Sequence, residues 1–190
     1  MSTNNLTTST GQKTMVSSQL EILRQAKDYL NTISTLQYNE VITPNFMSSA
    51  GAHIRHIIDH YQAIKVGVQK QFIDYDIRKR ESDIEHTPLA ALSKLAEISL
   101  WLQNLNSDAL ATTMTLSTEV SISSYQVETV NTTLARELVF AASHAVHHFA
   151  MIAQIALLQQ QSLPPNFGLA PATATYLRQQ QQDKKTLIFE

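Results

Sequence analysis

Histidines are the residues of this chain whose type and spacing could do chemistry. The 190-residue sequence holds seven, and six of them fall in two short windows: His53, His56 and His60, then His144, His147 and His148. Residues three or four apart share one side of an α-helix, so the first window spans an arc of about 60°. His144 and His148 stack one turn apart, whereas His147 points about 80° away from them. We therefore predict two helices whose histidines converge, with His147 beside the site or on the surface.

Buried imidazoles need polar partners, because burying an unpaired polar group costs stability. One divalent cation can satisfy three of them, and three nitrogen ligands with an open position are typical of a catalytic zinc site. Nickel, iron, copper and manganese also accept imidazole, since nitrogen ligands select weakly among metals. For any single histidine, a hydrogen bond to a carboxylate or a backbone carbonyl is the simpler interpretation. For the whole cluster we predict metal binding.

Four helices are expected to position these histidines. Capping and periodicity signals place them over residues 18–38, 49–71, 88–105 and 132–161. Ser18 with Glu21 forms a capping box at the start of the first helix. Ser48 or Ser49 caps the second, and Pro88 occupies the first turn of the third.

The remaining segments are expected to be shorter or less regular. Residues 1–16 are rich in Ser, Thr and Asn and predict a flexible tail, while residues 72–85 are charged without periodicity and predict a loop. Residues 112–130 alternate between polar and apolar and predict a small β-hairpin or extended excursion. A short helix is expected over 174–182. The predicted fold is all-α, an antiparallel four-helix bundle with that excursion between its third and fourth helices, in a single domain over 17–190.

Composition excludes several classes of function. A net charge of −2 and the lack of a sustained basic cluster argue against a nucleic-acid-binding protein. The sequence shows neither a secretory signal nor an apolar run of membrane-spanning length, so we expect a cytoplasmic protein without a membrane partner. The chain has no cysteine. Disulfides and thiolate ligands are therefore excluded, and any thiol used in catalysis must come from a small molecule.

Several stretches resemble the DinB-like superfamily of four-helix-bundle proteins. The match covers about residues 40–170 and is specific as a combination. It rests on the spacing from Ser49 to His56 and on four runs: Gly51–Tyr61 (GAHIRHIIDHY), Tyr75–Arg80 (YDIRKR), Ala135–Leu138 (AREL) and Ser143–His148 (SHAVHH).

The resemblance implies a divalent metal, zinc or nickel above all, bound by one histidine of the second helix and two of the last. These positions correspond to His56, His144 and His148. His53 and His60 are additions to the family pattern, which leaves open which histidine of the second helix reaches the metal. His56 leads because of its spacing from Ser49, and His60 is the alternative. The resemblance also implies a homodimer.

Characterised relatives of the superfamily include transferases and isomerases that use a small thiol cofactor, and some members are described as metal hydrolases. The resemblance thus implies a metal-dependent enzyme that acts on a small-molecule substrate. An ion in this site would polarise a substrate group or lower the pKa of a bound water or thiol. Glu137 is the candidate proton acceptor, or else it orients an imidazole. The alternative function is a non-catalytic bundle that binds a metal or senses a ligand.

Overall fold

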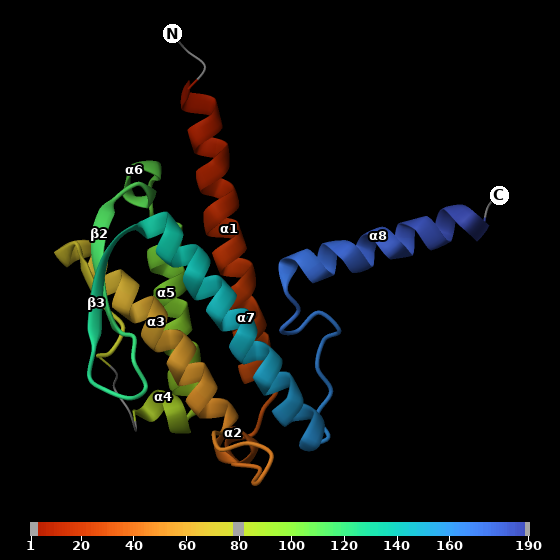
Figure 1. Ribbon diagram of the computed structural model, residues 1–190. Coiled ribbons are helices and arrows are strands. Elements are labelled where there is room, and N and C mark those ends of the chain that lie inside the picture. The colour runs from red at the N-terminus through yellow and green to blue at the C-terminus, as the bar shows by residue number, and fades with distance from the viewer. Residues whose placement is uncertain (1–3, 78–81, 189–190) are drawn as a thin grey trace.

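The structure is a computed structural model that describes residues 4–77 and 82–188, with side chains described over 14–77 and 82–183. Four long helices form the bundle (Figure 1): α1 (Asn4–Leu30), α3 (Ala50–Lys70), α5 (Pro88–Gln103) and α7 (Leu134–Leu158). Around the bundle, α1 lies between α5 and α7, and α3 closes the ring by packing on both of them. The predicted helical bundle is confirmed.

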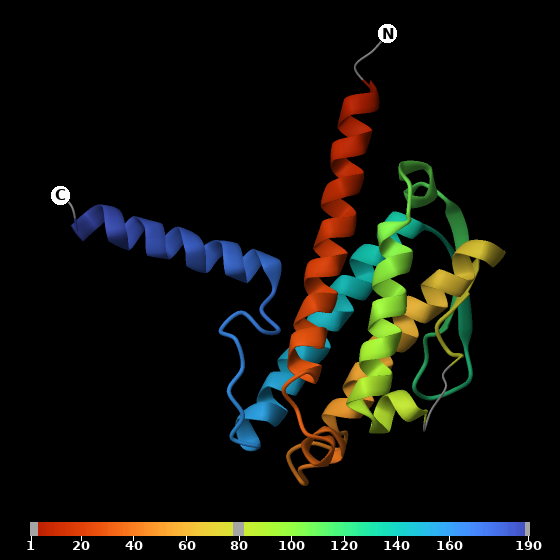
Figure 2. The same cartoon turned by 180° about the vertical axis from the view of Figure 1, so that it is seen from behind.

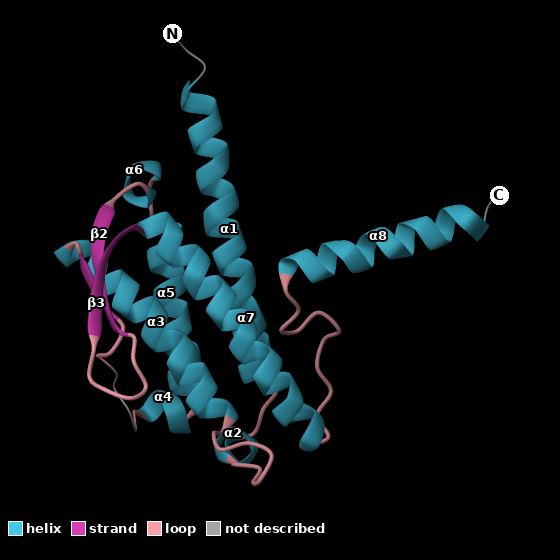
Figure 3. Cartoon of the chain, viewed as in Figure 1, coloured by secondary structure: helices cyan, strands magenta, loops and turns pink. Residues whose placement is uncertain are grey.

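Shorter elements surround the bundle (Figure 3). They are the helices α2 (Thr35–Asn39), α4 (Asp83–His86), α6 (Ser107–Leu110) and α8 (Pro171–Ile188), and the strands β1 (Phe72–Asp74), β2 (Thr113–Glu119) and β3 (Val127–Thr133). Helix α8 leaves the body of the molecule and projects away from it in both views (Figures 1 and 2). It is longer than the short helix predicted over 174–182.

The core is aliphatic and aromatic. Each bundle helix contributes side chains without exposed surface, among them Leu23, Ile54, Ile58, Leu95, Ile98, Leu138 and Phe149. Burying an apolar side chain of this size stabilises the fold by about 1.5–3 kcal/mol. A bundle held in this way can place polar side chains between α3 and α7 without depending on them for its stability.

Helix α3 begins where the sequence predicted. Ser49 has an extended backbone conformation, and its hydroxyl accepts a hydrogen bond from the amide of Ala52 at 3.1 Å. Two residues after Ser49, Gly51 allows α4 to pack closely on α3, because a Cβ at this position would lie 2.1 Å from the carbonyl oxygen of Glu85. The same contact region carries an ion pair from Arg55 of α3 to Glu85, at 2.8 Å.

The predicted hairpin is confirmed and belongs to a three-stranded sheet of order β1-β2-β3. Strands β2 and β3 pair antiparallel, with Leu116 opposite Val130. Strand β1 pairs parallel to β2, with Ile73 opposite Leu116. Ile73 and Leu116 are buried against the bundle, whereas Val130 is exposed. Because directly paired residues lie on the same face of a sheet, Val130 shares the face of Leu116. The sheet therefore packs on the bundle through β1 and β2, and β3 is exposed at Val130.

Three expectations about element boundaries are wrong. Helix α1 begins at Asn4 and not near Ser18, and the hydroxyl of Ser18 bonds back to the carbonyl of Thr14 instead of capping a helix. The first helix ends at Leu30 rather than near Tyr38, with α2 as a separate turn. The predicted loop over 72–85 contains β1 and α4, and its residues 78–81 lie outside the described part.

Helix α7 is the one described helix long and apolar enough to cross a membrane, judged by length and composition alone. The core helix of a soluble protein passes the same test, and 39% of the apolar window is buried inside the protein. The cytoplasmic location stays a prediction.

Candidate metal centre

The histidine windows face each other across the contact between α3 and α7, which pack side by side along the bundle. His60 is 8% exposed, and His56, His144 and His148 are half-buried. The rings touch: the His60 and His144 centroids are 4.2 Å apart, and those of His56 and His148 are 4.7 Å apart. The predicted convergence of two histidine-bearing helices is therefore present.

The nitrogen atoms converge on His144. Its Nε2 lies 2.9 Å from Nε2 of His56 and 3.1 Å from Nε2 of His148. One ligand atom from each of His56, His60 and His144 also falls within 4.8 Å of the other two, so these three could hold a metal ion. This group holds two of the predicted ligands, His56 and His144, together with the alternative, His60. The third predicted ligand, His148, is outside the group and reaches it through the contact of its Nε2 with Nε2 of His144.

This arrangement fits a cation better than a hydrogen-bond network. A neutral imidazole carries its proton on one nitrogen and its lone pair on the other. Nε2 of His144 therefore has one proton or one lone pair, and neither can serve the two nitrogens beside it with good geometry. Nitrogens 2.0–2.1 Å from one zinc ion lie roughly 2.8–3.4 Å apart at angles of about 90–110°. The two contacts of His144 fall in this range.

His60 is oriented for coordination by the backbone. Its Nδ1 lies 3.0 Å from the carbonyl oxygen of His56, to which it donates a hydrogen bond, so its lone pair is on Nε2. Metal-binding histidines usually make such a bond from their second nitrogen. His60 therefore meets the same chemical requirement as His56, and which of them completes the ligand set with His144 and His148 stays a prediction.

Burial favours the neutral form of two histidines, His148 and His53. Desolvation lowers the pKa of His148 to about 3, and positive charge on His144 and then His53 adds to the effect. Desolvation also lowers the pKa of His53, with charge on His147 as the next cause. Neutral imidazole is the form that binds metals, since the cation has no lone pair to give.

The other two histidines stand apart from the convergence. His147 is exposed, as expected from its angle on the helix, and its ring packs on that of His148 with centroids 5.3 Å apart. His86 lies at the end of α4, where its Nδ1 is 3.0 Å from the side-chain oxygen of Asn39.

Glu137, the candidate proton acceptor, has no exposed surface and is held by three donors. One carboxylate oxygen accepts from the hydroxyl of Tyr75 at 2.6 Å, and the other accepts from Thr132 at 2.5 Å and Arg136 at 2.7 Å. None of these donors is a histidine. The link to the cluster runs through Tyr75, whose ring stacks on that of His60 at 4.9 Å.

Two aromatic residues wall the cluster, and the sequence interpretation did not assign them to the site. Phe140 stacks on His144 at 5.7 Å, and Tyr75 stacks on His60. Burial, followed by the bond to Glu137, raises the pKa of the Tyr75 hydroxyl far above its usual range, so it stays a donor. The sequence does contain a signal for Phe140, because a residue four positions before His144 lies on the same side of the helix. Tyr75 lies in a quoted motif, but its partners are distant in sequence.

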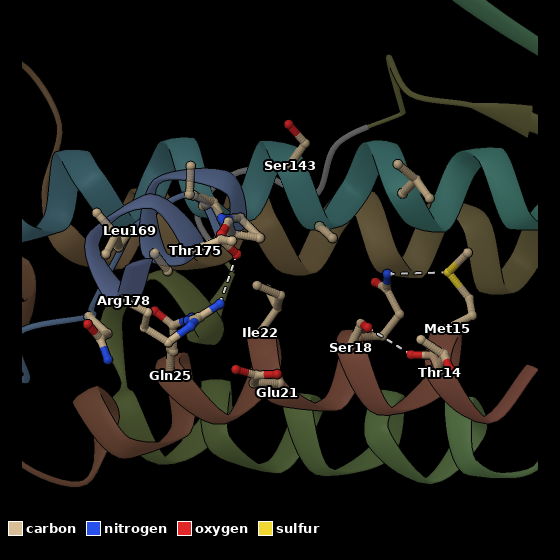
Figure 4. A pocket seen from close by; sticks show the side chains of 18 residues that line it. Thr14, Met15, Ser18, Glu21, Ile22, Gln25, Ser143, Leu169, Thr175 and Arg178 are labelled. Atoms are coloured by element: carbon tan, nitrogen blue, oxygen red, sulfur yellow. Dashed lines mark hydrogen bonds between the residues drawn. The ribbon is translucent and has the colours of Figure 1, made fainter. Parts of the chain in front are cut away.

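A separate cavity of about 1080 Å³ lies between α1, α7 and the start of α8 (Figure 4). Ile22 and Gln25 reach it from α1, Ser143 from α7, and Thr175 and Arg178 from α8. None of the described residues that line it is a histidine. The cavity and the histidine cluster are therefore distinct features of the molecule.

No protein-family model matches the chain. FK506-binding protein 5 of Rhizopus delemar is 30% identical over 108 residues, which are 57% of this chain but 28% of that protein. The chain thus spans little more than a quarter of this curated relative. A crystal structure of a DinB-like protein from Bacillus subtilis, YjoA, is 16% identical with a TM-score of 0.58, over 83% of this chain and 99% of that one. The chain therefore has the fold of the DinB-like proteins, as its histidine-bearing motifs predicted.

Proposed function

We propose that this chain binds one divalent metal ion, zinc or nickel above all, between α3 and α7, and acts as a metal-dependent enzyme on a small-molecule substrate. The observation that carries the proposal is that Nε2 of His144 lies 2.9 Å from Nε2 of His56 and 3.1 Å from Nε2 of His148. A bound ion would supply Lewis acidity to a substrate group or to an attacking nucleophile.

The residues of the chain prepare the site for such an ion. His56, His144 and His148 offer lone pairs, and the low pKa of His148 keeps its own available in acid. Phe140 and Tyr75 shield the histidines from water, which strengthens electrostatic interactions inside the site. Glu137 acts on this arrangement from outside, by holding the hydroxyl of Tyr75.

The reaction class we propose is transfer of a small-molecule thiol, with hydrolysis as the second candidate. Three protein nitrogens leave a coordination position for substrate, which distinguishes a catalytic from a structural site. Because the sequence has no cysteine, the thiol is a cosubstrate. If His60 binds in addition to the other three, the site becomes a closed four-nitrogen site, and the non-catalytic alternative gains support.

We also propose a homodimer. The feature that supports it is α8, which projects from the body of the molecule (Figure 2). Two of its larger apolar side chains, Tyr176 and Leu177, are exposed. Light scattering coupled to size-exclusion chromatography gives the mass directly. A monomer at all concentrations would refute this part without affecting the metal site.

The first experiment measures metal per protomer by mass spectrometry, on protein purified without a nickel resin. Ala variants of His56, His144 and His148 should lose the ion, while His147→Ala and His86→Ala should keep it. Full occupancy in both His144→Ala and His148→Ala would refute the metal site. If His60→Ala loses the metal while His56→Ala keeps full occupancy, the ligand from α3 is His60 and not His56.

The second experiment separates an enzyme from a binding module. Metal-loaded and chelator-stripped protein are compared in single-turnover assays with small thiols and electrophiles. We expect product with the loaded protein alone, and none with the His144→Ala variant. Metal binding at full occupancy without turnover of any thiol or hydrolysable substrate would favour the non-catalytic module.

A further inference from the structure

A fifth histidine extends the cluster along α3. Nδ1 of His53 lies 2.9 Å from Nδ1 of His148, and the two ring centroids are 5.1 Å apart. His148 therefore faces two histidines with its two nitrogens, because its Nε2 lies 3.1 Å from Nε2 of His144. The contact between His53 and His148 is on the side of the ring away from the convergence.

Proton placement decides what this contact does. A neutral imidazole has one N–H, so a His148 that gives the lone pair of Nε2 to an ion carries its proton on Nδ1. That Nδ1–H lies within hydrogen-bonding distance of Nδ1 of His53, which must then accept it with a lone pair. The proton of His53 is consequently on Nε2. The opposite direction, in which His53 donates, would put a proton on Nε2 of His148 and prevent coordination.

We propose that His53 is a positioning residue: it accepts the Nδ1–H bond of His148 and so fixes His148 as an Nε2 ligand. The proposal rests on the proposed function, since it assumes that His148 coordinates the ion. Carboxylates and backbone carbonyls are the common acceptors for this bond. Here the acceptor is the imidazole of His53, on the opposite helix. The hydrogen bond therefore also links α3 to α7 across the site.

The surroundings of His53 agree with this assignment. Among the residues that the structure describes, Nε2 of His53 is buried without a hydrogen-bond partner. The Nδ1 contact with His148 is therefore what orients this side chain by hydrogen bonding. A buried nitrogen left unpaired costs stability, and this cost is understandable if the other nitrogen of the ring serves the site.

The test compares the zinc affinity of four proteins by chelator competition: wild type, His53→Ala, His53→Asn and His147→Ala. His53→Ala should bind about 10–100-fold more weakly, the usual effect of removing such a partner. His53→Asn should recover most of the affinity, because its side-chain oxygen can accept the same bond near the position of Nδ1. His147→Ala is the matched control, since it removes an imidazole that also packs on His148.

A spectroscopic measurement distinguishes positioning from a general structural role. In copper(II)-loaded protein, pulsed electron paramagnetic resonance detects the remote nitrogen of each coordinated imidazole. One remote-nitrogen signal should change in His53→Ala, return towards wild type in His53→Asn and stay unchanged in His147→Ala. Circular dichroism of each variant confirms that the fold is retained.

The outcomes separate the two proposals. Wild-type affinity and an unchanged signal in His53→Ala would overturn the role of His53 while leaving the metal site intact. Complete loss of zinc in both His53→Ala and His53→Asn would make His53 a ligand, which also overturns it. A wild-type protein that binds neither zinc nor copper would refute the proposed function, and the role of His53 with it.

Discussion

Two polar clusters lie along helix α7, and they satisfy their polar groups in different ways. At the start of the helix, the carboxylate of Glu137 receives hydrogen bonds from Tyr75, Thr132 and Arg136, so a negative group meets donors only. Two turns later, Nε2 of His144 faces two further Nε2 atoms, so groups of the same kind meet one another. The first cluster pairs an acceptor with donors, whereas the second brings together imidazole nitrogens that could hold a metal ion.

The difference separates a structural polar cluster from a ligand site. Glu137 joins α7 to β3 through Thr132 and to the segment after β1 through Tyr75, so its bonds fasten the sheet to the bundle. The histidines join α3 to α7, which an aliphatic core already holds together. We therefore expect substitutions in the first cluster to change stability, and substitutions in the second to change metal binding.

The largest stability effect is expected at Glu137. Glu137→Ala leaves the hydroxyls of Tyr75 and Thr132 unpaired and opens a cavity, which should lower the free energy of unfolding by about 3–5 kcal/mol. Urea denaturation of the metal-free protein measures this loss. Tyr75→Phe, which removes one of the three bonds, should cost about 1 kcal/mol. Zinc bound per folded protomer should stay near wild type, and loss of zinc at unchanged stability would show that Glu137 belongs to the metal site.

The reverse pattern is expected at His144. His144→Leu should abolish zinc binding and leave the metal-free protein as stable as wild type, or more stable by about 1 kcal/mol, as at other functional positions. Isothermal titration with zinc and urea denaturation of the same sample give both quantities. If the variant instead unfolds like Glu137→Ala, the histidines hold the bundle together and the distinction between the two clusters fails.

The pH dependence of the metal-free protein tests the burial of the histidines. The pKa of His148 is about 3 in the folded protein against an ordinary value of 6.5, so between these values the unfolded chain binds the extra proton. The contribution of neutral His148 to the free energy of unfolding is therefore complete above about pH 7 and is lost as the pH falls towards 3. Denaturation midpoints at pH 7.5, 6.5, 5.5 and 4.5 measure the slope.

The control for this prediction is His148→Gln, which cannot titrate and should show a flatter profile over the same range. An identical slope in the two proteins would mean that His148 is accessible to protons in the folded state. The low pKa also means that protons should not compete with zinc for His148 between pH 7 and 5. The loss of affinity should therefore be less steep than three equally titrating histidines would give.

Local signals predicted much of the fold, and long-range pairing accounts for the misses. The Ser49 cap, the proline at the start of α5 and the alternation in the hairpin each depend on neighbouring residues, and each gave the correct element. Strand β1 has three residues and forms because it pairs with β2, about 40 residues later in the chain. No local sequence pattern predicts this pairing. The start of α1 was missed because Ser18 bonds to the preceding turn at Thr14, where the capping-box pattern predicts a cap.

The site was predicted to the level of the helix face but not to the level of atoms. Helical spacing alone places His56 and His60 opposite His144 and His148. It does not give the register between α3 and α7, which decides that His53 meets His148 while His60 meets His144. For the same reason the three donors around Glu137, one of them 62 residues away in sequence, were not foreseen.

The smallest effect is expected at the cap of α3, one turn before His53. Ser49→Ala removes the bond from the serine hydroxyl to the amide of Ala52 and should cost about 1 kcal/mol. The matched control is Ser48→Ala, the other serine that the sequence offered as a cap, which should stay within about 0.5 kcal/mol of wild type. Zinc affinity should be unchanged in both, because the histidines lie inside a helix whose later turns are held by the core. A drop in zinc affinity in Ser49→Ala alone would mean that the site depends on the exact start of α3. Stability and metal binding would then be less separable than the comparison of the two clusters on α7 suggests.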